Sequence, residues 1–328
     1  MRNRLIVSAS TAVAVTLAFT LGTLASGASP QAGAPASAKV FRPVGGSPAP
    51  AAPLASMSNL SYDGGQVFTA PSIFLIYWGP QWSSGFSTGG YSSAQAQTYV
   101  NSFFGGVGGS PWLNSTTQYC QGISVGQQFC AGQAGAQFVT NPAAQLAGTW
   151  IDTTAVPRSP SDSAVRAAAA RGASHFGYRS TTLYMVLTPH GRSTPGFGVQ
   201  WCAYHDNSTF SGQPLAYANI PYQPDAGASC GRNFVNGTND TFGHGYFDGF
   251  SIVTGHEYAE TITDAFPSSI LAWVDSQGAE NGDKCAWSQG PGPQSAARDV
   301  TLGSQSFAVQ SLWSNLANSG SGGCVISS

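Results

Sequence analysis

The sequence predicts a mixed α/β (α+β) fold, in which a mixed sheet supports one helix with metal-binding residues and an irregular C-terminal lobe follows. Three observations predict it. Short apolar runs that end in Gly or Pro alternate with helical patterns. The segment "TGHEYAETITDAFP" (254–267) places a His-Glu pair inside a helical pattern, and six cysteines lie between residues 120 and 324.

The first 28 residues are predicted to be a secretory signal peptide. Arg2 and Arg4 precede an apolar run from Leu5 to Ala25, and small residues follow, with a cleavage site after Ala28. A transmembrane anchor is the weaker alternative, because serines and threonines dilute the run and no basic cluster follows it. We therefore expect an exported, extracellular protein without a membrane span.

Charge is scarce in this chain. Removing residues 1–28 takes two arginines away, so the 12 Lys+Arg fall to 10 against 14 Asp+Glu, a net charge of −4. Only 8% of the residues are charged, which argues against nucleic-acid binding and against polybasic membrane attachment.

The chain that follows the signal peptide is expected to have two parts. Residues 29–56 are rich in Ala, Pro and Ser and cannot repay their ordering entropy, so they form a linker or a propeptide. Residues 57–328 are expected to form a single secreted domain. Within it, 57–267 hold the sheet and the active-site helix, and 268–328 form the C-terminal lobe.

The six cysteines predict disulfides, since the number is even and the chain is exported. We expect sequential pairs, although six cysteines allow fifteen pairings. No CxxC occurs, so neither a thiolate zinc site nor a cysteine nucleophile is favoured. The expected pairs are Cys120–Cys130, Cys202–Cys230 and Cys285–Cys324.

The apolar and capping patterns predict the elements in order. "SIFLIYWG" (72–79) and "STTLYMVLTP" (180–189) are typical of buried strands, and 198–206 and 214–222 of further strands. Helices are predicted from an N-cap at Ser92 or Ser93, and over 159–174 with Gly172 as the C-cap. Residues 105–150 are Gly-rich, and the Cys120–Cys130 pair is expected to staple a loop or a hairpin within them.

The helix that contains the His-Glu pair is predicted to begin at an Asp248 N-cap and to end at Pro267. Short strands and turns are expected after it. Strand, helix, helix, several strands and then a metal-motif helix is the order found in zincin-like peptidases, so we expect a zincin-like sheet.

Three residues of this helix are spaced to share one face. His256, Glu260 and Asp264 occupy positions i, i+4 and i+8, so two of them can hold one ion. Glu257 lies about 100° round the helix, where a carboxylate can act as the general base, as in HExxH zinc peptidases. The alternative is an ordinary helix that binds no metal.

A catalytic zinc site needs a third protein ligand. We expect Glu280, which follows the helix at the distance typical of thermolysin-like peptidases, with Asp283 as a supporting carboxylate. Asp264 is the competing third ligand. His190 and His205 are available to orient substrate, to stabilise an oxyanion or to bind the ion. We expect one divalent ion, zinc first, with manganese, iron or calcium as alternatives because a carboxylate replaces the second imidazole.

Four segments resemble one family. "IFLIYWGPQW", "TLYMVLTPHG", "VQWCAYHD" and "GHEYAETITDAF…WVDSQGAENGDKCAW" together resemble the extracellular phosphate-induced, or EXORDIUM, family, and especially its secreted bacterial relatives. The resemblance covers roughly residues 62–328. It implies an extracellular protein associated with cell-wall or apoplastic responses, and by itself it implies no particular reaction.

Two functions of different classes remain open at this stage. The first is a secreted metal-dependent hydrolase, a zinc peptidase-like enzyme acting on a peptide or protein. The second is a non-catalytic, wall-associated extracellular protein with a structural ion site or none. A serine hydrolase is a distant third, since no Ser/His/Asp set stands out from a chain this rich in serine.

Overall fold

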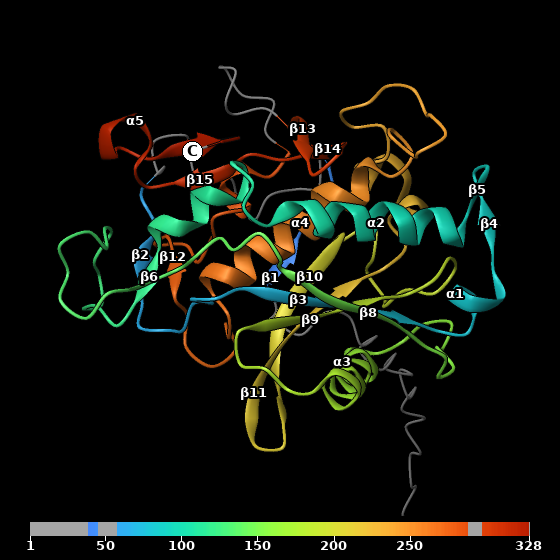
Figure 1. The fold of residues 1–328 in the computed structure, drawn as a ribbon, viewed down its shortest axis with the longest axis horizontal. Helices are drawn as coiled ribbons and strands as arrows, with labels where there is room; N and C mark the ends of the chain where they lie inside the picture. Colours follow the sequence, from blue (N-terminus) through green and yellow to red (C-terminus); the bar gives the residue numbers. More distant parts are fainter. Residues whose placement is uncertain (1–38, 45–57, 288–296, 328) are drawn as a thin grey trace, which may run out of the picture. The chain divides into compact units, whose positions relative to one another are not determined.

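A six-stranded mixed sheet forms the centre of the fold in the computed structural model, which describes residues 39–44, 58–287 and 297–327 (Figure 1). The strands, in spatial order, are β1 (Lys39–Phe41), β10 (Ala203–Phe210), β11 (Gln213–Ile220), β9 (Thr182–Leu187), β3 (Ser72–Trp78) and β8 (Leu146–Asp152). β1, β10 and β11 pair antiparallel, whereas β11, β9, β3 and β8 pair parallel. The predicted mixed α/β fold with a mixed sheet is confirmed.

Helices cover both faces of this sheet. α3 (Asp162–Phe176) packs on one face, and α2 (Ser93–Val107) and α4 (Asp248–Thr263) pack on the other (Figure 1). The side-chain alternation of β3 explains the arrangement, because successive residues of a strand point to opposite faces. Phe74 and Ile76 join the core beside α3, while their neighbours along the strand join the core beside α2 and α4.

The predicted helix starts are close to those observed, whereas the predicted ends of α3 and α4 are wrong. Ser92 caps α2 through a capping box with Gln95. α3 does not end at Gly172 but continues to Phe176. A Cβ at Gly172 would lie 2.2 Å from Cδ1 of Ile76, so this glycine lets the helix pack closely on β3. A glycine is needed at this position for close packing, and it does not mark the end of the helix.

α4 runs through the protein interior, and all of its residues are buried. The helix begins at Asp248 and ends at Thr263, so it stops short of the predicted end at Pro267. Asp248 is its first helical residue rather than its N-cap, which is Phe247. A helix buried on every side has no solvent face on which charged residues can be hydrated. Its acids therefore need partners inside the protein.

Short elements surround the central sheet. The glycine-rich stretch 105–150 runs into strand β8, which was not predicted because its residues are mostly half buried and lack an apolar alternation. The two-stranded pairs are β2 (Ser61–Tyr62) with β12 (Trp273–Val274), β4 (Ser87–Thr88) with β5 (Tyr91–Ser92), β6 (Cys120–Gln121) with β7 (Gln137–Phe138), β13 (Arg298–Leu302) with β14 (Gln305–Val309), and β15 (Leu312–Ser314) with β16 (Gly323–Val325). The short helices are α1 (Gln81–Ser84), α5 (Ala317–Gly320), η2 (Leu113–Gln118), η3 (Gln223–Cys230) and η4 (Asp283–Cys285).

All three predicted disulfides are confirmed, and none of the cysteines is free. The third one, between Cys285 and Cys324, joins η4 to β16, so it ties the end of the chain to the loop that follows α4. Such cross-links stabilise extracellular domains mainly by restricting the unfolded chain.

The N-terminal residues are described only in part. The predicted signal peptide, 1–28, lies outside the described residues, as does most of the segment 29–56. Residues 39–44 of that segment are described, and they include β1, which was not predicted. Phe41 is fully buried there and pairs with Ala203 of β10, so this apolar residue supplies the packing that the surrounding composition lacks. Within the three described ranges, no helix has the length and apolarity needed to cross a membrane.

Candidate metal centre

Two histidines and two glutamates from three parts of the fold meet at α4. His256 and Glu260 lie one turn apart on the helix, with Nε2 of His256 3.0 Å from Oε2 of Glu260. His205 comes from the adjacent strand β10, and its Nδ1 lies 3.6 Å from the same glutamate oxygen. Glu280, from the loop after β12, places Oε1 3.6 Å from Nε2 of His205.

These residues and Glu257 form two overlapping groups whose ligand atoms are close enough to hold an ion. His205, Glu260 and Glu280 form one group, and His256, Glu257 and Glu260 form the other. In each group the ligand atoms lie within 4.8 Å of one another. Glu260 belongs to both groups, so the predicted ligands His256, Glu260 and Glu280 are divided between them, and His205 joins them.

Every residue of these two groups is buried. The exposed fractions are 0% for His205, His256, Glu257 and Glu280 and 1% for Glu260. Several of their polar atoms form no hydrogen bond: Nε2 of both histidines, Oε2 of Glu260 and both carboxylate oxygens of Glu280. Buried charged groups are normally paired or coordinate a metal. Imidazole nitrogens and carboxylate oxygens are the donors that zinc, manganese and iron take in proteins, so the residues present fit a divalent ion.

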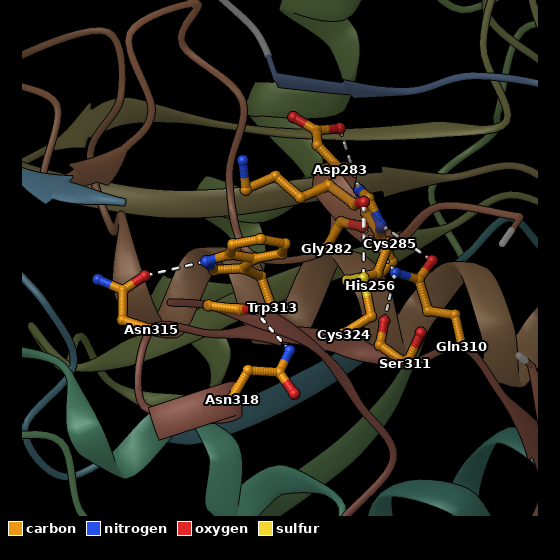
Figure 2. Close-up of a disulfide and its surroundings, with 12 residues drawn as sticks. His256, Gly282, Asp283, Cys285, Gln310, Ser311, Trp313, Asn315, Asn318 and Cys324 are labelled. Atoms are coloured by element: carbon orange, nitrogen blue, oxygen red, sulfur yellow. Dashed lines mark hydrogen bonds and ion pairs between the residues drawn. A yellow bond between two sulfur atoms is a disulfide. The ribbon is translucent and has the colours of Figure 1, made fainter. Parts of the chain in front are cut away.

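Hydrogen bonds on the far side of each histidine leave its Nε2 available. Nδ1 of His256 lies 3.2 Å from Oε1 of Gln310, an acceptor, so Nδ1 carries the proton (Figure 2). The amide of Gln310 is held in this orientation because its nitrogen donates to the Gly282 carbonyl at 2.8 Å. Nδ1 of His205 lies 3.1 Å from Oε2 of Glu257, which likewise accepts. Metal-binding histidines are commonly oriented in this way.

Burial raises the pKa values of the carboxyl groups well above their usual range. Desolvation raises the pKa of Glu257 to about 7, against the lowering effect of its hydrogen bond to His205. It raises the pKa of Glu280 to about 8 and that of Asp264 to about 8. Burial also raises the pKa of Glu260, and the nearby charge of Asp283 adds to the rise. Without a cation, these groups are stable in the interior mainly as neutral acids.

The loop that contains η4 holds the ligands in place. The backbone N–H of Asp283 donates to Oε1 of Glu260 at 2.8 Å, and its carboxylate accepts from the N–H of Glu280 at 3.2 Å. Asp283, expected as a supporting carboxylate, therefore contacts both Glu260 and Glu280. Gly282 lies so close to the centre that a Cβ there would be 2.6 Å from Nδ1 of His256. Figure 2 shows this loop beside the Cys285–Cys324 disulfide.

Two other predicted site residues lie outside these groups. Asp264 ends α4 as its C-cap, and its Oδ1 accepts from the N–H of Ala272 at 2.9 Å. The helix stops before Asp264, so this residue does not continue the face of His256 and Glu260. His190 is 46% exposed and pairs through Nδ1 with Oδ1 of Asp225 at 2.5 Å. The structure therefore places His190 in a surface pair and Asp264 beside the centre, in neither ligand group.

Three contributors to the centre were not predicted. Gln310 and Gly282 support the ligands, and Phe41 stacks on the ring of His256 with centroids 3.8 Å apart. A single glutamine or glycine in a polar, glycine-rich chain carries no local signal of such a role. Their positions follow from how distant segments pack.

The arrangement is chemically able to hold a cation and to keep a carboxyl group, Glu257, beside it. Comparison of the chain with family models, with curated proteins and with solved structures finds no match. The site geometry is therefore the basis for any functional assignment.

Proposed function

We propose that this protein is an extracellular metal-dependent hydrolase of the zinc peptidase type, with its centre at His205, His256, Glu260 and Glu280. The convergence of unpartnered nitrogen and carboxylate atoms on Glu260 is the observation that carries the proposal. The zincin-like interpretation of the sheet and helix, and the resemblance to the phosphate-induced family, are part of the same proposal. Three disulfides are compatible with export.

The four proposed ligands supply two imidazoles and two carboxylates, a donor set that suits zinc and also manganese or iron. Both Nε2 atoms are free of hydrogen bonds, and the pairing of each Nδ1 with Gln310 or Glu257 favours the tautomer that carries its proton on Nδ1. A divalent ion held there would polarise a substrate carbonyl and make water a stronger acid.

Glu257 is the proposed general base. Its pKa, raised by burial to about 7, suits a group that accepts and returns a proton near neutral pH. Its Oε1 forms no hydrogen bond, so one carboxylate oxygen is free to accept a proton while the other holds His205. The distances also place Glu257 in one of the two ligand groups. An experiment must therefore distinguish whether Glu257 acts as the general base or as a metal ligand.

The test combines metal analysis with activity. Elemental analysis of the purified protein should find a divalent metal, and the loaded protein should cleave a generic protein substrate such as casein. If Glu257→Gln keeps its metal content but loses cleavage, Glu257 acts as the general base. Lost metal identifies a ligand instead, and unchanged cleavage contradicts the proposal.

A non-catalytic role is the second candidate, and the burial of the centre favours it. With exposed fractions of 0–1%, none of the ligand residues faces solvent. An ion in such a place would cross-link α4, β10 and the loop at 275–285 and would stabilise the fold. A protein that binds one metal tightly, loses stability when it is removed and cleaves nothing would fit this role.

A further inference from the structure

Strand β1 covers one of the proposed ligands, His256. Phe41 stacks on His256 with an interplanar angle of 19°, and it stacks on Trp287 with centroids 4.8 Å apart. Phe41 has an exposed fraction of 0%. Its ring therefore lies against one of the proposed ligands and fills the space between two aromatic rings.

Lys39 brings the one described ammonium group that interacts with the acids of the centre. It pairs in register with His205, and its Nζ donates to the carbonyl of Gly278 at 2.8 Å. Burial alone would lower the pKa of Lys39, but Glu280 and three further carboxylates raise it instead. The Lys39 ammonium group therefore lies within the electrostatic field of the centre, where Glu260 and Glu280 are proposed metal ligands.

Residues 39–44 bind along the edge of the sheet in the way that an extended peptide does. β10 pairs with β11 on one side and with β1 on the other, so β1 occupies the outer edge of the sheet. Further backbone bonds join Cys202 to Phe41 at 2.6 Å and Val44 to Ser229 at 2.7 Å, and the Trp287 indole donates to the Arg42 carbonyl at 2.6 Å. Main-chain bonds plus one pocket for an alternate side chain are the usual means of recognising an extended peptide.

We propose that the edge of β10 is a peptide-binding groove, and that residues 39–44 occupy it as a built-in mimic of the substrate. The groove would take an extended peptide antiparallel to β10, with an aromatic side chain between His256 and Trp287 and a basic residue two positions before it. This inference rests on the proposed function, because it names the substrate class of the same centre. It also assigns residues 39–44 an inhibitory contact, which competes with substrate and slows cleavage by the full chain without abolishing it.

Val40 provides a matched control within the same strand. Its side chain points to the opposite face and packs against the core beside α3. Both Phe41→Ala and Val40→Ala should therefore weaken the packing of β1, but only Phe41→Ala removes the ring that lies between His256 and Trp287.

The experiment uses the full-length protein and a labelled peptide of sequence AKVFRPV, which copies residues 38–44. Fluorescence anisotropy should show that Phe41→Ala binds the peptide at least about tenfold more tightly than the wild type or Val40→Ala. A peptide with alanine in place of its phenylalanine should bind at least about tenfold more weakly. Equal binding to all three proteins would overturn the groove.

A second variant covers the case in which Phe41→Ala does not fold. A specific protease site is inserted between residues 50 and 51, and the folded protein is cut there. The cut protein should exchange its own segment for the labelled peptide, whereas the uncut protein should not. No exchange after complete cutting would show that β1 is a fixed strand of the sheet and would overturn the inference.

These outcomes separate the groove from the hydrolase. Peptide binding is measured without any cleavage, so a protein that binds peptide but contains no metal would keep the groove and remove the hydrolase. A metal-loaded protein that cleaves casein and fails both peptide tests would do the opposite.

Discussion

Nε2 of His256 lies 3.0 Å from Oε2 of Glu260, one helical turn further along α4, and neither atom forms a hydrogen bond. Two buried groups this close, each without a hydrogen-bond partner, are costly to the fold unless a proton or a cation lies between them. The adjoining acids Glu257 and Glu280 are equally buried. A divalent ion would satisfy the two atoms together, and this relationship underlies the functional account.

Replacing Glu257 with glutamine should abolish hydrolysis while leaving the ion in place. Loss of a general base costs about 10²- to 10⁴-fold in rate. Glutamine keeps the size of the side chain and can still accept the hydrogen bond from His205. The measurements are casein cleavage and the zinc content of the same sample. If cleavage persists at the wild-type rate, Glu257 is not the base.

The metal-free protein should become less stable as the pH rises. Burial raises the pKa of Glu257 to about 7 and those of Asp264 and Glu280 to about 8, above their values in the unfolded chain of roughly 4. The folded state therefore binds more protons than the unfolded state between these pH values. The contribution of this protonation to the free energy of unfolding is fully present below about pH 4 and is lost as the pH rises through about 7 to 8. Thermal unfolding of chelated protein should occur at a lower temperature at about pH 8.5 than at about pH 5.5.

Zinc should reverse this trend. Ligands must lose their protons to bind a metal, so stabilisation by zinc grows with pH. Glu280→Gln provides the control, because it should flatten the pH dependence of the metal-free protein. A metal-free protein that is as stable at about pH 8.5 as at about pH 5.5 would contradict the buried, protonated state of these acids.

Replacing Gln310 with alanine should weaken metal binding about 10- to 100-fold, as loss of a residue that orients a metal-binding histidine usually does. The substitution removes the acceptor of the His256 proton and the donor to the Gly282 carbonyl. Gln223→Ala is the matched control, because Gln223 is buried and donates to backbone carbonyls of Cys202 and Pro221 instead. Zinc titration calorimetry on both variants checks the prediction. Equal zinc affinities would remove Gln310 from the centre.

Gly282→Ala should disturb the centre through size alone. The new Cβ would lie 2.6 Å from Nδ1 of His256 and 2.9 Å from Oε1 of Glu260, so one of them must move. Gly105→Ala is the control, since a Cβ at this position in α2 meets nothing within 4 Å. We expect weaker zinc binding in the first variant only, and the second should be more stable by about 0.5–1 kcal/mol. Unchanged zinc binding by Gly282→Ala would show that the loop does not define the site.

Local patterns in the sequence predicted the elements that carry the centre. The helix period placed His256 and Glu260 on one face. The expectation of export and the even number of cysteines predicted disulfides, and sequential pairing, one choice among fifteen, is confirmed. Those inferences depend on residues close together in the chain or on a small number of alternatives. They did not require knowledge of the tertiary structure.

The rest of the site depends on contacts between distant segments. His205 reaches Glu257 and Glu260 because β10 lies second in the sheet order, beneath α4, and no local pattern encodes that order. Phe41 was missed because three residues in an Ala/Pro/Ser-rich segment form a strand only when β10 offers an edge. Gly172 appeared to be a helix end because close packing on Ile76 also requires glycine.

Zinc binding by the wild type and by Glu260→Gln tests the central claim most directly. Glu260 belongs to both ligand groups, so its loss should affect the ion more than the loss of any residue that belongs to one. The metal is first removed with a chelator, and zinc is then titrated into the metal-free protein in a calorimeter. The wild type should bind zinc tightly, and Glu260→Gln should bind it at least about 100-fold more weakly. Equal affinities in the two proteins, or no zinc binding by the folded wild type, would contradict the account.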